Sequence, residues 1–338
     1  MSGVSHREVA NDEGGMRLDR WFKEHYPELA FGALNRLLRK GSVRVDGSRV
    51  KANARLVAGQ KVRVPPIRIE ARPGEERVIP QAPKALDDFK KITLFEDDMV
   101  LVLNKPAGLA VQGGSGINKH LDGMLEALRD RQGRKPRLVH RLDRETSGVI
   151  VVAKTKAAAS ALAGSFRARS TKKVYWALVR GVPKPAQGRL STYLQKGQEI
   201  NDSGQERVAV LRDKAATADH AVTLYSTVEN SGQKLAWLTL RPITGRTHQL
   251  RAHCNHMGHP IIGDPKYFDV ENWQLPGGIQ NRLHLHARRL IIPHPKSGTI
   301  DVTAPLPPHM QQSWNLLGLD LGEAAQDVDW DVLDRAKR

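Results

Sequence analysis

The chain has 338 residues, of which 40% are hydrophobic and 26% charged, a composition typical of a soluble globular protein. Lys and Arg outnumber Asp and Glu by 53 to 36, and this net charge of +17 favours a polyanionic partner such as nucleic acid. The sequence contains no apolar run long enough to cross a membrane, and its single cysteine, Cys254, excludes an internal disulfide. We therefore expect a cytoplasmic protein with no membrane partner.

The N-terminal part is predicted to form a small basic domain behind a tail. Residues 1–15 are polar and contain glycine, so we expect a disordered tail there. Two amphipathic helices should follow, one ending before Pro27 and one from Ala33 to Lys40, and then short strands with a turn at 46–47. Residues 16–72 contain 14 Lys and Arg against 5 Asp and Glu, which is +9 of the total charge of +17.

Two helices followed by a hairpin, with the run from Leu37 to Gly47, resemble the S4 RNA-binding domain, to which we assign residues 16–70. The resemblance implies that a basic helix and the hairpin edge follow an RNA backbone through phosphate contacts. A solvated basic face with no partner is the alternative. The candidate phosphate contacts are Arg36, Arg39, Lys40 and Arg44.

Three further segments complete the expected domain organisation. Residues 71–90 contain three prolines and little apolar periodicity, which is typical of a semi-rigid linker. Residues 91–318 should form the main domain. Residues 319–338 are acidic and contain nothing that points to a chemistry, so we expect a loosely held tail.

Two glycine-containing turns follow the first apolar strand of the main domain, which is expected at 99–103. Residues 105–108 end that strand with Lys-Pro-Ala-Gly, and residues 113–116 read Gly-Gly-Ser-Gly, whose backbone could approach a phosphate. A glycine-rich loop is weak evidence when taken alone. Lys105 is nevertheless a candidate RNA contact.

The run from His140 to Gly148 joins a charged loop to a buried strand. Val149 to Ala153 are apolar and mostly β-branched, as in a core strand, whereas the residues before them have turn chemistry and no helical period. Asp143 therefore lies at the mouth of a core strand between Arg141 and Arg144, and neighbouring cations favour its ionised form. An ionised carboxylate beside basic side chains suits chemistry on a polyanion, with a structural ion pair as the alternative.

This run resembles the signature loop of the RluA-type pseudouridine synthases, which isomerise uridine to pseudouridine within ribosomal or transfer RNA. The resemblance implies that Asp143 is catalytic. It also implies an α+β fold: a mixed, mostly antiparallel central sheet with flanking helices and an RNA-binding cleft, preceded by the S4 domain. The turns at 105–108 and 113–116 resemble the RluC-like branch of the family, which favours large-subunit ribosomal RNA or a pre-ribosomal particle as the partner. The matching positions of the loop are His140, Arg141, Leu142, Asp143, Thr146, Ser147 and Gly148.

A second motif lies in the strand expected at 174–179, where Tyr175 follows Lys173. The motif resembles one of the family whose tyrosine stacks against the target base, and a ring beside an active-site loop suits the holding of a flipped pyrimidine. Core packing of the ring is the alternative.

A third motif runs from Arg241 to His253. By resemblance, Arg251 pairs with the catalytic Asp143, and a guanidinium can hold a carboxylate bidentately. Contact of both Arg246 and Arg251 with phosphate alone is the alternative. Resemblance also places Arg141 where the extruded base had been, with a plain phosphate contact as its alternative. The other candidate RNA contacts of this domain are Arg144, Arg246, His248 and Lys173.

A cluster of histidines around Cys254 raises a zinc hydrolase as a rival hypothesis. The spacing argues against it, because there is no His-Glu-x-x-His motif and because Arg246 and Arg251 would place two fixed cations beside the metal. We therefore expect no metal site, and histidines that are structural or contact RNA. The cluster consists of His248, His253, His256 and His259.

Formation of pseudouridine breaks the bond between uracil N1 and ribose C1′ and rejoins the base through C5. Neither electrons nor water are consumed, so we expect no cofactor, in agreement with a sequence that lacks a dinucleotide fingerprint or Walker loop. Asp143, Tyr175 and Arg251 supply a carboxylate, a ring for the base and an electrostatic partner. Attack of Asp143 on C1′ and removal of the C2′ proton both stay open. A monomer is expected, and a catalytically silent RNA-binding or ribosome-assembly protein is the alternative.

Overall fold

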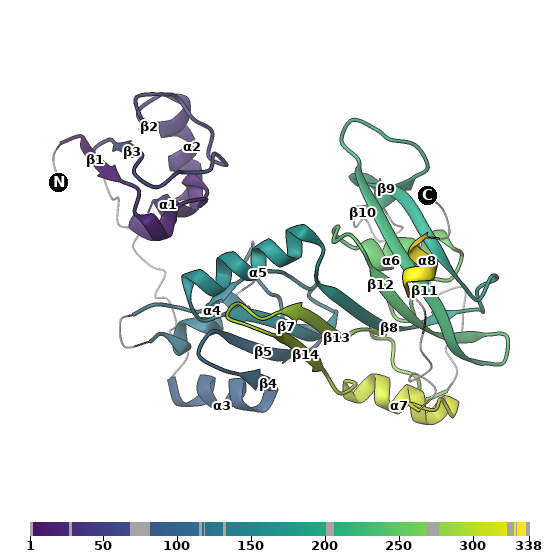
Figure 1. Cartoon of the computed structure of the whole chain (residues 1–338). Helices are drawn as coiled ribbons and strands as arrows, with labels where there is room; N and C mark the ends of the chain where they lie inside the picture. Colours follow the sequence, from purple (N-terminus) through teal and green to yellow (C-terminus); the bar gives the residue numbers. More distant parts are fainter. Residues whose placement is uncertain are drawn as a thin grey trace. The chain divides into compact units, whose positions relative to one another are not determined.

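The computed structural model divides the chain into two compact units, Met1–Val78 and Ile79–Arg338 (Figure 1). The two units are described separately below. The structure describes residues 3–26, 29–67, 82–114, 117, 119–130, 133–200, 206–268, 277–322, 328 and 330–335.

The first unit packs two helices against a small sheet. The helices α1 (Leu18–His25) and α2 (Phe31–Arg39) confirm the two that the sequence predicts, and their apolar faces meet in one core cluster. The strands β1 (Ser5–Glu8), β2 (Arg44–Val45) and β3 (Lys61–Val64) form an antiparallel sheet in the order β1-β3-β2.

The predicted disordered tail, residues 1–15, was wrong from residue 5 onward. β1 pairs with β3 along its whole length, and Glu13 is 5% exposed. Its carboxylate accepts hydrogen bonds from Trp21 Nε1 (2.8 Å), His25 Nε2 (2.7 Å) and the backbone N of Ala10 (3.1 Å). Burial opposes the ionisation of Glu13, but these bonds outweigh it and lower the pKa of the carboxyl. The polar composition of this segment suggested disorder. Composition alone does not reveal that folding brings hydrogen-bond donors to the buried carboxylate of Glu13.

The segment predicted as a linker, 71–90, is ordered at its end. Residues 71–81 lie outside the described residues, and the boundary between the units, after Val78, falls among them. The linker prediction was wrong from residue 82, because α3 (Ala82–Ile92) begins there. Phe89 of this helix is 3% exposed and packs into an apolar cluster with Leu101. Burial of that ring favours a helix where the prolines indicated extended chain.

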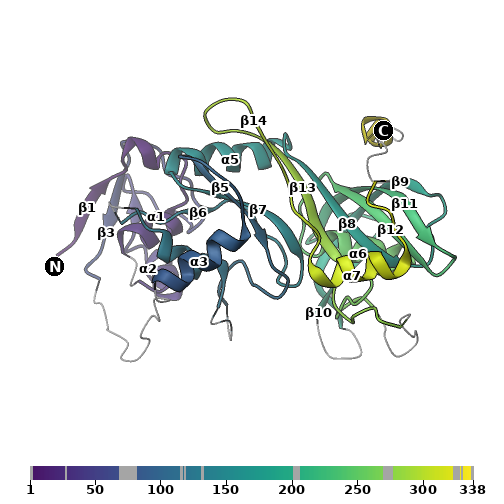
Figure 2. The ribbon, with the colours of Figure 1, turned by 90° about the horizontal axis from the view of Figure 1, so that it is seen from below.

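The second unit is built on one 11-stranded sheet (Figures 1 and 2). In chain order its strands are β4 (Thr93–Glu96), β5 (Val100–Lys105), β6 (Arg137–Leu138), β7 (Ser147–Ala153), β8 (Lys172–Arg180), β9 (Gln187–Ile200), β10 (Glu206–Leu211), β11 (Asp219–Ser231), β12 (Leu235–Pro242), β13 (Leu285–Pro293) and β14 (Thr299–Thr303). They hydrogen bond in the order β10-β9-β11-β12-β8-β13-β7-β5-β4, and β14 and β6 add at β13 and β7. The pair β13 and β7 runs parallel, whereas the other pairs are antiparallel. The predicted mixed, mostly antiparallel α+β fold is therefore confirmed.

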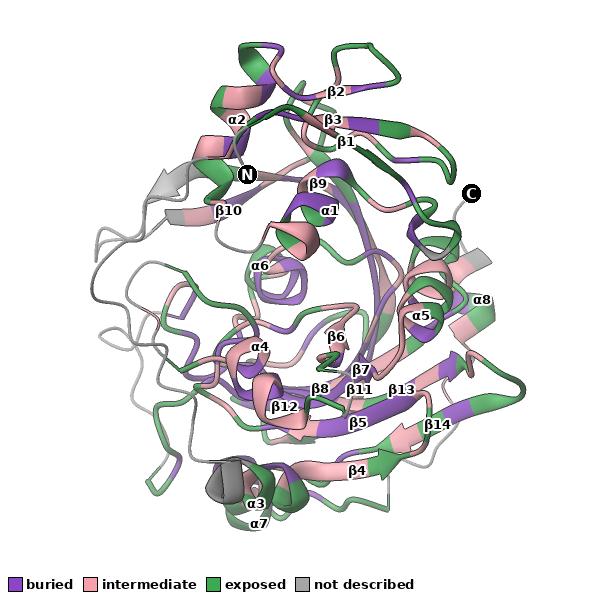
Figure 3. Cartoon of the chain, turned by 90° about the vertical axis from the view of Figure 1, so that its left-hand side faces the viewer, coloured by how far each residue is buried: buried purple, intermediate pink, exposed green. Residues whose placement is uncertain are grey.

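Helices cover both faces of this sheet. On one face lie α4 (Leu121–Met124) and α6 (Gln249–His256), and Tyr175 of β8 packs against the apolar clusters of both. On the other face α5 (Lys156–Ala168) packs over β5 and β7, and α7 (Pro308–Leu317) packs over β8 and β12. Figure 3 shows β5 and β13 coloured mostly as buried between these layers. Within the described parts of the chain, no helix is both long and apolar enough to span a membrane.

The predicted loose acidic tail, 319–338, was wrong for its last described segment. α8 (Trp330–Arg335) packs on β9 and β11 and buries Leu333. Two of its carboxylates face cations of the sheet. The ion pairs are Asp331 with Arg241 at 3.8 Å and Asp334 with Arg189 at 3.5 Å. The acidic residues therefore complement a basic part of the sheet, and an apolar anchor holds the helix in place.

Three buried histidines form hydrogen bonds with hydroxyl groups inside the second unit. His253 contacts Thr192 and Thr223, His284 contacts Ser313, and His286 contacts Ser147. The distances are 2.8–2.9 Å. Burial lowers the pKa of each ring to about 4, so each stays neutral at pH 7. Among the residues that the structure describes, no three His, Cys, Asp or Glu side chains are grouped as metal ligands.

These histidines predict a loss of stability in acid. The unfolded chain protonates histidine near pH ~6.5, whereas His253, His284 and His286 stay neutral in the folded state down to about pH 4. The free energy of unfolding in urea should be insensitive to these groups above pH 7. It should then fall as the pH decreases toward 4, by up to ~1.4 kcal/mol per pH unit for each ring. His286→Gln should reduce this slope relative to that of the unchanged protein. An equal slope for the variant and the unchanged protein would contradict the assignment.

Candidate active site

The loop that carries Asp143 joins β6 to β7 and is pinned to the core on both sides. His140 Nε2 accepts a hydrogen bond from the backbone N of Val151 (2.9 Å), and its ring stacks on Phe166 with the centroids 4.6 Å apart. Burial lowers the pKa of His140 to about 3, so the ring acts as a neutral acceptor. The backbone N of Thr146 donates to the carbonyl of Asp143 (3.2 Å) and closes the turn.

The end of this loop requires glycine. Gly148 has φ +112, and a Cβ there would lie 2.2 Å from the carbonyl O of Ala287. The cause is the parallel pairing of β7 with β13, which brings Ala287 directly opposite Gly148. The end of the loop therefore packs directly against β13, and this close contact fixes the position of the loop that carries Asp143.

Asp143 pairs with Arg251 as the sequence predicts. Nη1 of Arg251 lies 3.5 Å from Oδ2 of Asp143, although the two residues are 108 positions apart in the chain. The arginine side chain is 4% exposed, whereas that of Asp143 is 21% exposed. The carboxylate is therefore half-buried, held by a buried cation and still open to a substrate.

A second carboxylate, Asp264, orients this arginine, and the sequence analysis missed it. Its two oxygens accept from Arg251 Nε (2.7 Å) and Nη2 (2.6 Å). The backbone N atoms of Lys266 and Tyr267 also donate to Oδ1 of Asp264, at 2.9 and 3.2 Å. Asp264 takes the short bidentate pair and leaves Asp143 one long contact. The only sequence signal for this role was an Asp between Gly and Pro, which also indicates an ordinary turn.

His248 lies at the start of α6 with its ring near the carboxylate of Asp143. Its Nε2 is 4.0 Å from Oδ2 of Asp143, and its Nδ1 is 3.4 Å from the hydroxyl of Tyr267. Burial lowers the pKa of His248 to about 4, and Arg251 adds to this effect while Asp143 opposes it. The ring is therefore neutral near pH 7 and adds no positive charge to the site.

Tyr175 of β8 lies close enough to Asp143 to feel its charge. Burial, and after it the carboxylate of Asp143, raise the pKa of the phenol above its usual range. The ring packs against apolar clusters that contain Leu142 and Leu240. It therefore offers a neutral aromatic surface next to the carboxylate, where the sequence predicts one.

Lys105 was predicted to contact RNA, and this prediction was wrong. The side chain is 0% exposed, and Nζ donates to the carbonyl O atoms of Pro106 (3.0 Å), Leu109 (2.8 Å) and Arg144 (3.0 Å). Burial lowers the pKa of Lys105 to about 7. The negative charges of Glu145 and Asp143 act against this decrease. Lys105 instead ties the turn after β5 to the loop that carries Asp143.

The other predicted RNA contacts of this unit take different positions. Arg141 and Arg144 are exposed beside Asp143 in the chain, and Arg144 Nε donates to the carbonyl of Gly108 (3.1 Å). Arg246 is exposed and turns to β11. There it donates to the carbonyl of His220 (3.1 Å) and lies 3.4 Å from Asp219. Lys173 is half-buried, and burial lowers its pKa.

In the first unit, the predicted phosphate contacts lie at the end of α2 and in the hairpin after it. Arg36, Arg39 and Lys40 are exposed. Arg44 is half-buried and donates to the carbonyls of Gly41 (3.2 Å) and Gly47 (3.0 Å), so part of its guanidinium holds the hairpin turn.

Comparisons with known proteins agree with this fold. Residues 99–256 match the family model described as RNA pseudouridylate synthase. "Ribosomal large subunit pseudouridine synthase C" of Pasteurella multocida is 37% identical over 311 residues, which are 90% of this chain and 91% of that protein. The chain belongs to the RNA pseudouridine synthase family. The protein of the same name from Escherichia coli K12 is 39% identical over 306 residues, 86% of this chain and 89% of that protein.

Two solved structures of human family members share the fold. "Human RNA Pseudouridylate Synthase Domain Containing 4" is 30% identical with a TM-score of 0.59, and the match covers 71% of this chain and 98% of that one. "Human RNA Pseudouridylate Synthase Domain Containing 1" is 26% identical with a TM-score of 0.51, covering 68% and 95%. This pseudouridine synthase is therefore an isomerase that acts on RNA.

The division of Arg251 between two carboxylates predicts the effect of changing Asp264. Asp264→Asn keeps the volume and removes the charge that orients the guanidinium, so kcat for uridine isomerisation should fall by roughly 10- to 100-fold while KM changes little. The matched control is Asp301→Asn, which breaks a similar bidentate pair with the exposed Arg289 (2.6 and 2.7 Å). Both variants should be compared by release of tritium from C5-labelled uridine in RNA. A kcat for Asp264→Asn equal to that of the control would refute the positioning role.

Proposed function

We propose that this pseudouridine synthase converts specific uridines of large-subunit ribosomal RNA to pseudouridine. The bacterial relatives carry that substrate in their names, and the chain matches 91% and 89% of the length of two of them. The observation that carries the proposal is the approach of Asp143 to a buried arginine, Arg251, at 3.5 Å.

The chemistry follows from the charges around Asp143. A carboxylate that attacks C1′ or removes the C2′ proton must be ionised. Its oxygen atoms must also stay free to react, which a short bidentate ion pair would prevent. Arg251 supports the ionised form through one long contact, because Asp264 takes its short bonds. Neutral His248 and Tyr175 border the carboxylate without adding charge. After the N1–C1′ bond breaks, the ring of Tyr175 would retain the freed uracil while C5 turns toward C1′; when the C5–C1′ bond has formed, the C5 proton leaves to solvent and N1 takes up a proton.

We further propose that exposed cations near Asp143 hold the RNA. Arg141 and Arg144 flank the carboxylate in the chain and are solvent-accessible. Arg141 would fill the space left by the extruded base or contact a phosphate, and both roles are compatible with its exposure. Arg246 is exposed just before the N-terminus of α6. His248, at that N-terminus, would contact the RNA as a neutral group.

The first unit is proposed to be an S4 domain that grips the RNA backbone. Its two helices and antiparallel sheet agree with that interpretation, and so do the exposed cations at the end of α2. These groups would add sequence-independent affinity through phosphate contacts. We propose that the protein works as a cytoplasmic monomer on ribosomal RNA or a pre-ribosomal particle, because one chain carries both the catalytic unit and this basic unit.

The proposal predicts the outcome of removing the charge at residue 143. Asp143→Asn should abolish release of tritium from C5-labelled uridine in large-subunit ribosomal RNA, because an amide can neither attack C1′ nor take a proton. RNA affinity should change by less than ~3-fold, since the phosphate contacts remain. Glu145→Gln, a carboxylate two positions away, is the control and should keep turnover. Release of tritium by Asp143→Asn, or no release by the wild-type protein, would overturn the proposal, and the second result would leave a silent RNA-binding protein.

The basic unit is tested by charge removal at its exposed cations. The triple variant of Arg36, Arg39 and Lys40 to Ala should weaken RNA binding by ~10-fold or more and lower its salt dependence, while kcat at saturating RNA stays unchanged. The control removes the same charge at exposed cations that are ion-paired in the second unit. Its substitutions are Lys90→Ala, Arg129→Ala and Arg134→Ala. Equal losses for both triples would show that only net charge matters.

A further inference from the structure

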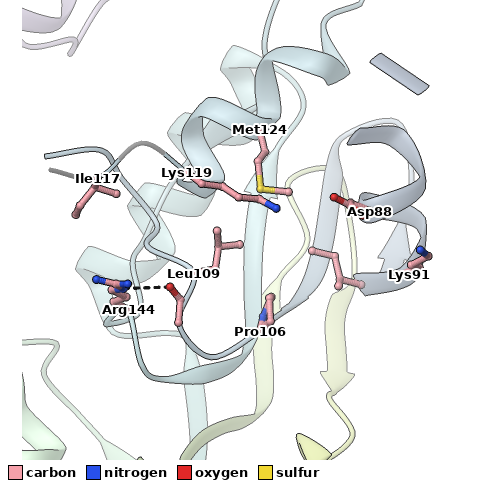
Figure 4. Close-up of a pocket in the computed structure, with 10 residues that line it drawn as sticks. Asp88, Lys91, Pro106, Leu109, Ile117, Lys119, Met124 and Arg144 are labelled. Carbon is pink, nitrogen blue, oxygen red and sulfur yellow. Dashed lines mark hydrogen bonds between the residues drawn. The ribbon is translucent and has the colours of Figure 1, made fainter. Parts of the chain in front are cut away.

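A pocket of about 530 Å³ opens beside the catalytic loop of the second unit (Figure 4). It is lined by segments far apart in sequence: α3, the turn after β5, residues 117 and 119, α4 and the loop that carries Asp143. Its volume is in the range of ~300–1,000 Å³ that small-ligand pockets occupy. Neither the reaction nor the catalytic pair described above uses this space.

The lining combines an apolar wall with cations. Ile92, Leu109 and Met124 supply apolar side chains. The cationic lining residues are Lys91, Lys119 and Arg144, against one carboxylate, Asp88. Both lysines and Arg144 are exposed, and Nε of Arg144 also contacts the carbonyl of Gly108 (3.1 Å) and a carboxylate oxygen of Glu145 (3.5 Å). An apolar surface for a flat ring beside cations for a phosphate is the combination that binds an unstacked nucleotide of single-stranded RNA.

The pocket borders the loop that carries Asp143, because Arg144 is one of its lining residues. Arg144 directly follows Asp143, and consecutive Cα atoms lie ~3.8 Å apart. The side chain of Arg144 also donates to Gly108 in the pocket wall (3.1 Å). Leu109 and Met124 belong to the apolar cluster that packs against Tyr175. An RNA strand that delivers a uridine to Asp143 would therefore have a neighbouring nucleotide near this pocket.

We propose that the pocket holds a second, unstacked nucleotide of the substrate RNA, next to the target uridine. The base would lie on Leu109 and Met124, and its phosphate on Lys119, whose side chain extends beside them, while Arg144 and Lys91 at opposite ends of the pocket would contact the neighbouring phosphates (Figure 4). The proposal rests on the function proposed above and adds to it a source of site selectivity, because a neighbouring nucleotide that leaves its stack easily would favour extrusion of the target. Charge favours RNA as the occupant, since the pocket cations continue the basic surface beside Asp143.

The experiment scans the RNA with 2-aminopurine, which brightens when it is unstacked. The probe is a hairpin of large-subunit ribosomal RNA that binds the protein, with 2-aminopurine placed in turn at each position flanking one uridine. The full-length Asp143→Asn protein is used so that no turnover occurs. One flanking position should brighten severalfold on binding. Lys119→Glu and Lys91→Glu in this background should remove most of that increase and weaken RNA binding by about tenfold.

The matched control is Lys90→Glu, the same charge reversal on the neighbouring residue of α3, which is exposed and does not line the pocket. It should keep the fluorescence increase. Loss of the increase with Lys90→Glu, or no bright flanking position, would overturn the proposal. Competition by millimolar free AMP that abolishes the signal without displacing the RNA would assign the pocket to free nucleotides instead. Because the readout is binding, it stands apart from the tritium assay, whose failure alone would remove the proposed function.

Discussion

The proposed active site depends on how one guanidinium is shared between two carboxylates. Arg251 is almost fully buried, and a buried cation needs a partner that satisfies its charge and its donors. Asp264, equally buried, supplies that partner through a bidentate pair and is itself anchored by two backbone N–H groups. The remaining Nη1 faces Asp143 at 3.5 Å. The short ion pair of Arg251 with Asp264 is thus separate from its single longer contact with Asp143.

The scaffold fixes both partners of that contact from different parts of the chain. Both ends of the loop that carries Asp143 contact the sheet. At one end His140 accepts a hydrogen bond from the sheet, and at the other end Gly148 packs closely against Ala287. Arg251 is on α6, which packs on the same face of the sheet. The parallel pairing of β7 with β13 provides the close approach at Gly148, so this parallel pair in a mostly antiparallel sheet positions the end of the loop that carries Asp143.

The charge of the protein acts at two levels. Its large positive excess is a property of composition, and it supports association with RNA wherever the cations lie. Around Asp143, however, burial keeps two basic side chains from offering a positive charge to a substrate. Lys105 turns inward to three carbonyls and His248 stays neutral. The immediate surroundings of the carboxylate are therefore less positive than the sequence suggests, which leaves the exposed arginines and the basic first unit to hold the phosphates.

The sequence by itself predicted the fold class and the family, and its resemblance to that family singled out Asp143, Tyr175 and Arg251, because each lies in a contiguous motif that can be recognised without the fold. Only the tertiary structure decided which groups support them. The partner of Arg251 is Asp264, Lys105 is buried, and the segments at Glu13 and α8 are ordered by donors and cations distant in sequence. Polar composition predicts exposure, but burial is set by long-range contacts that form when the sheet assembles. The physical reason is that a buried polar group is stable only where the fold supplies its partner.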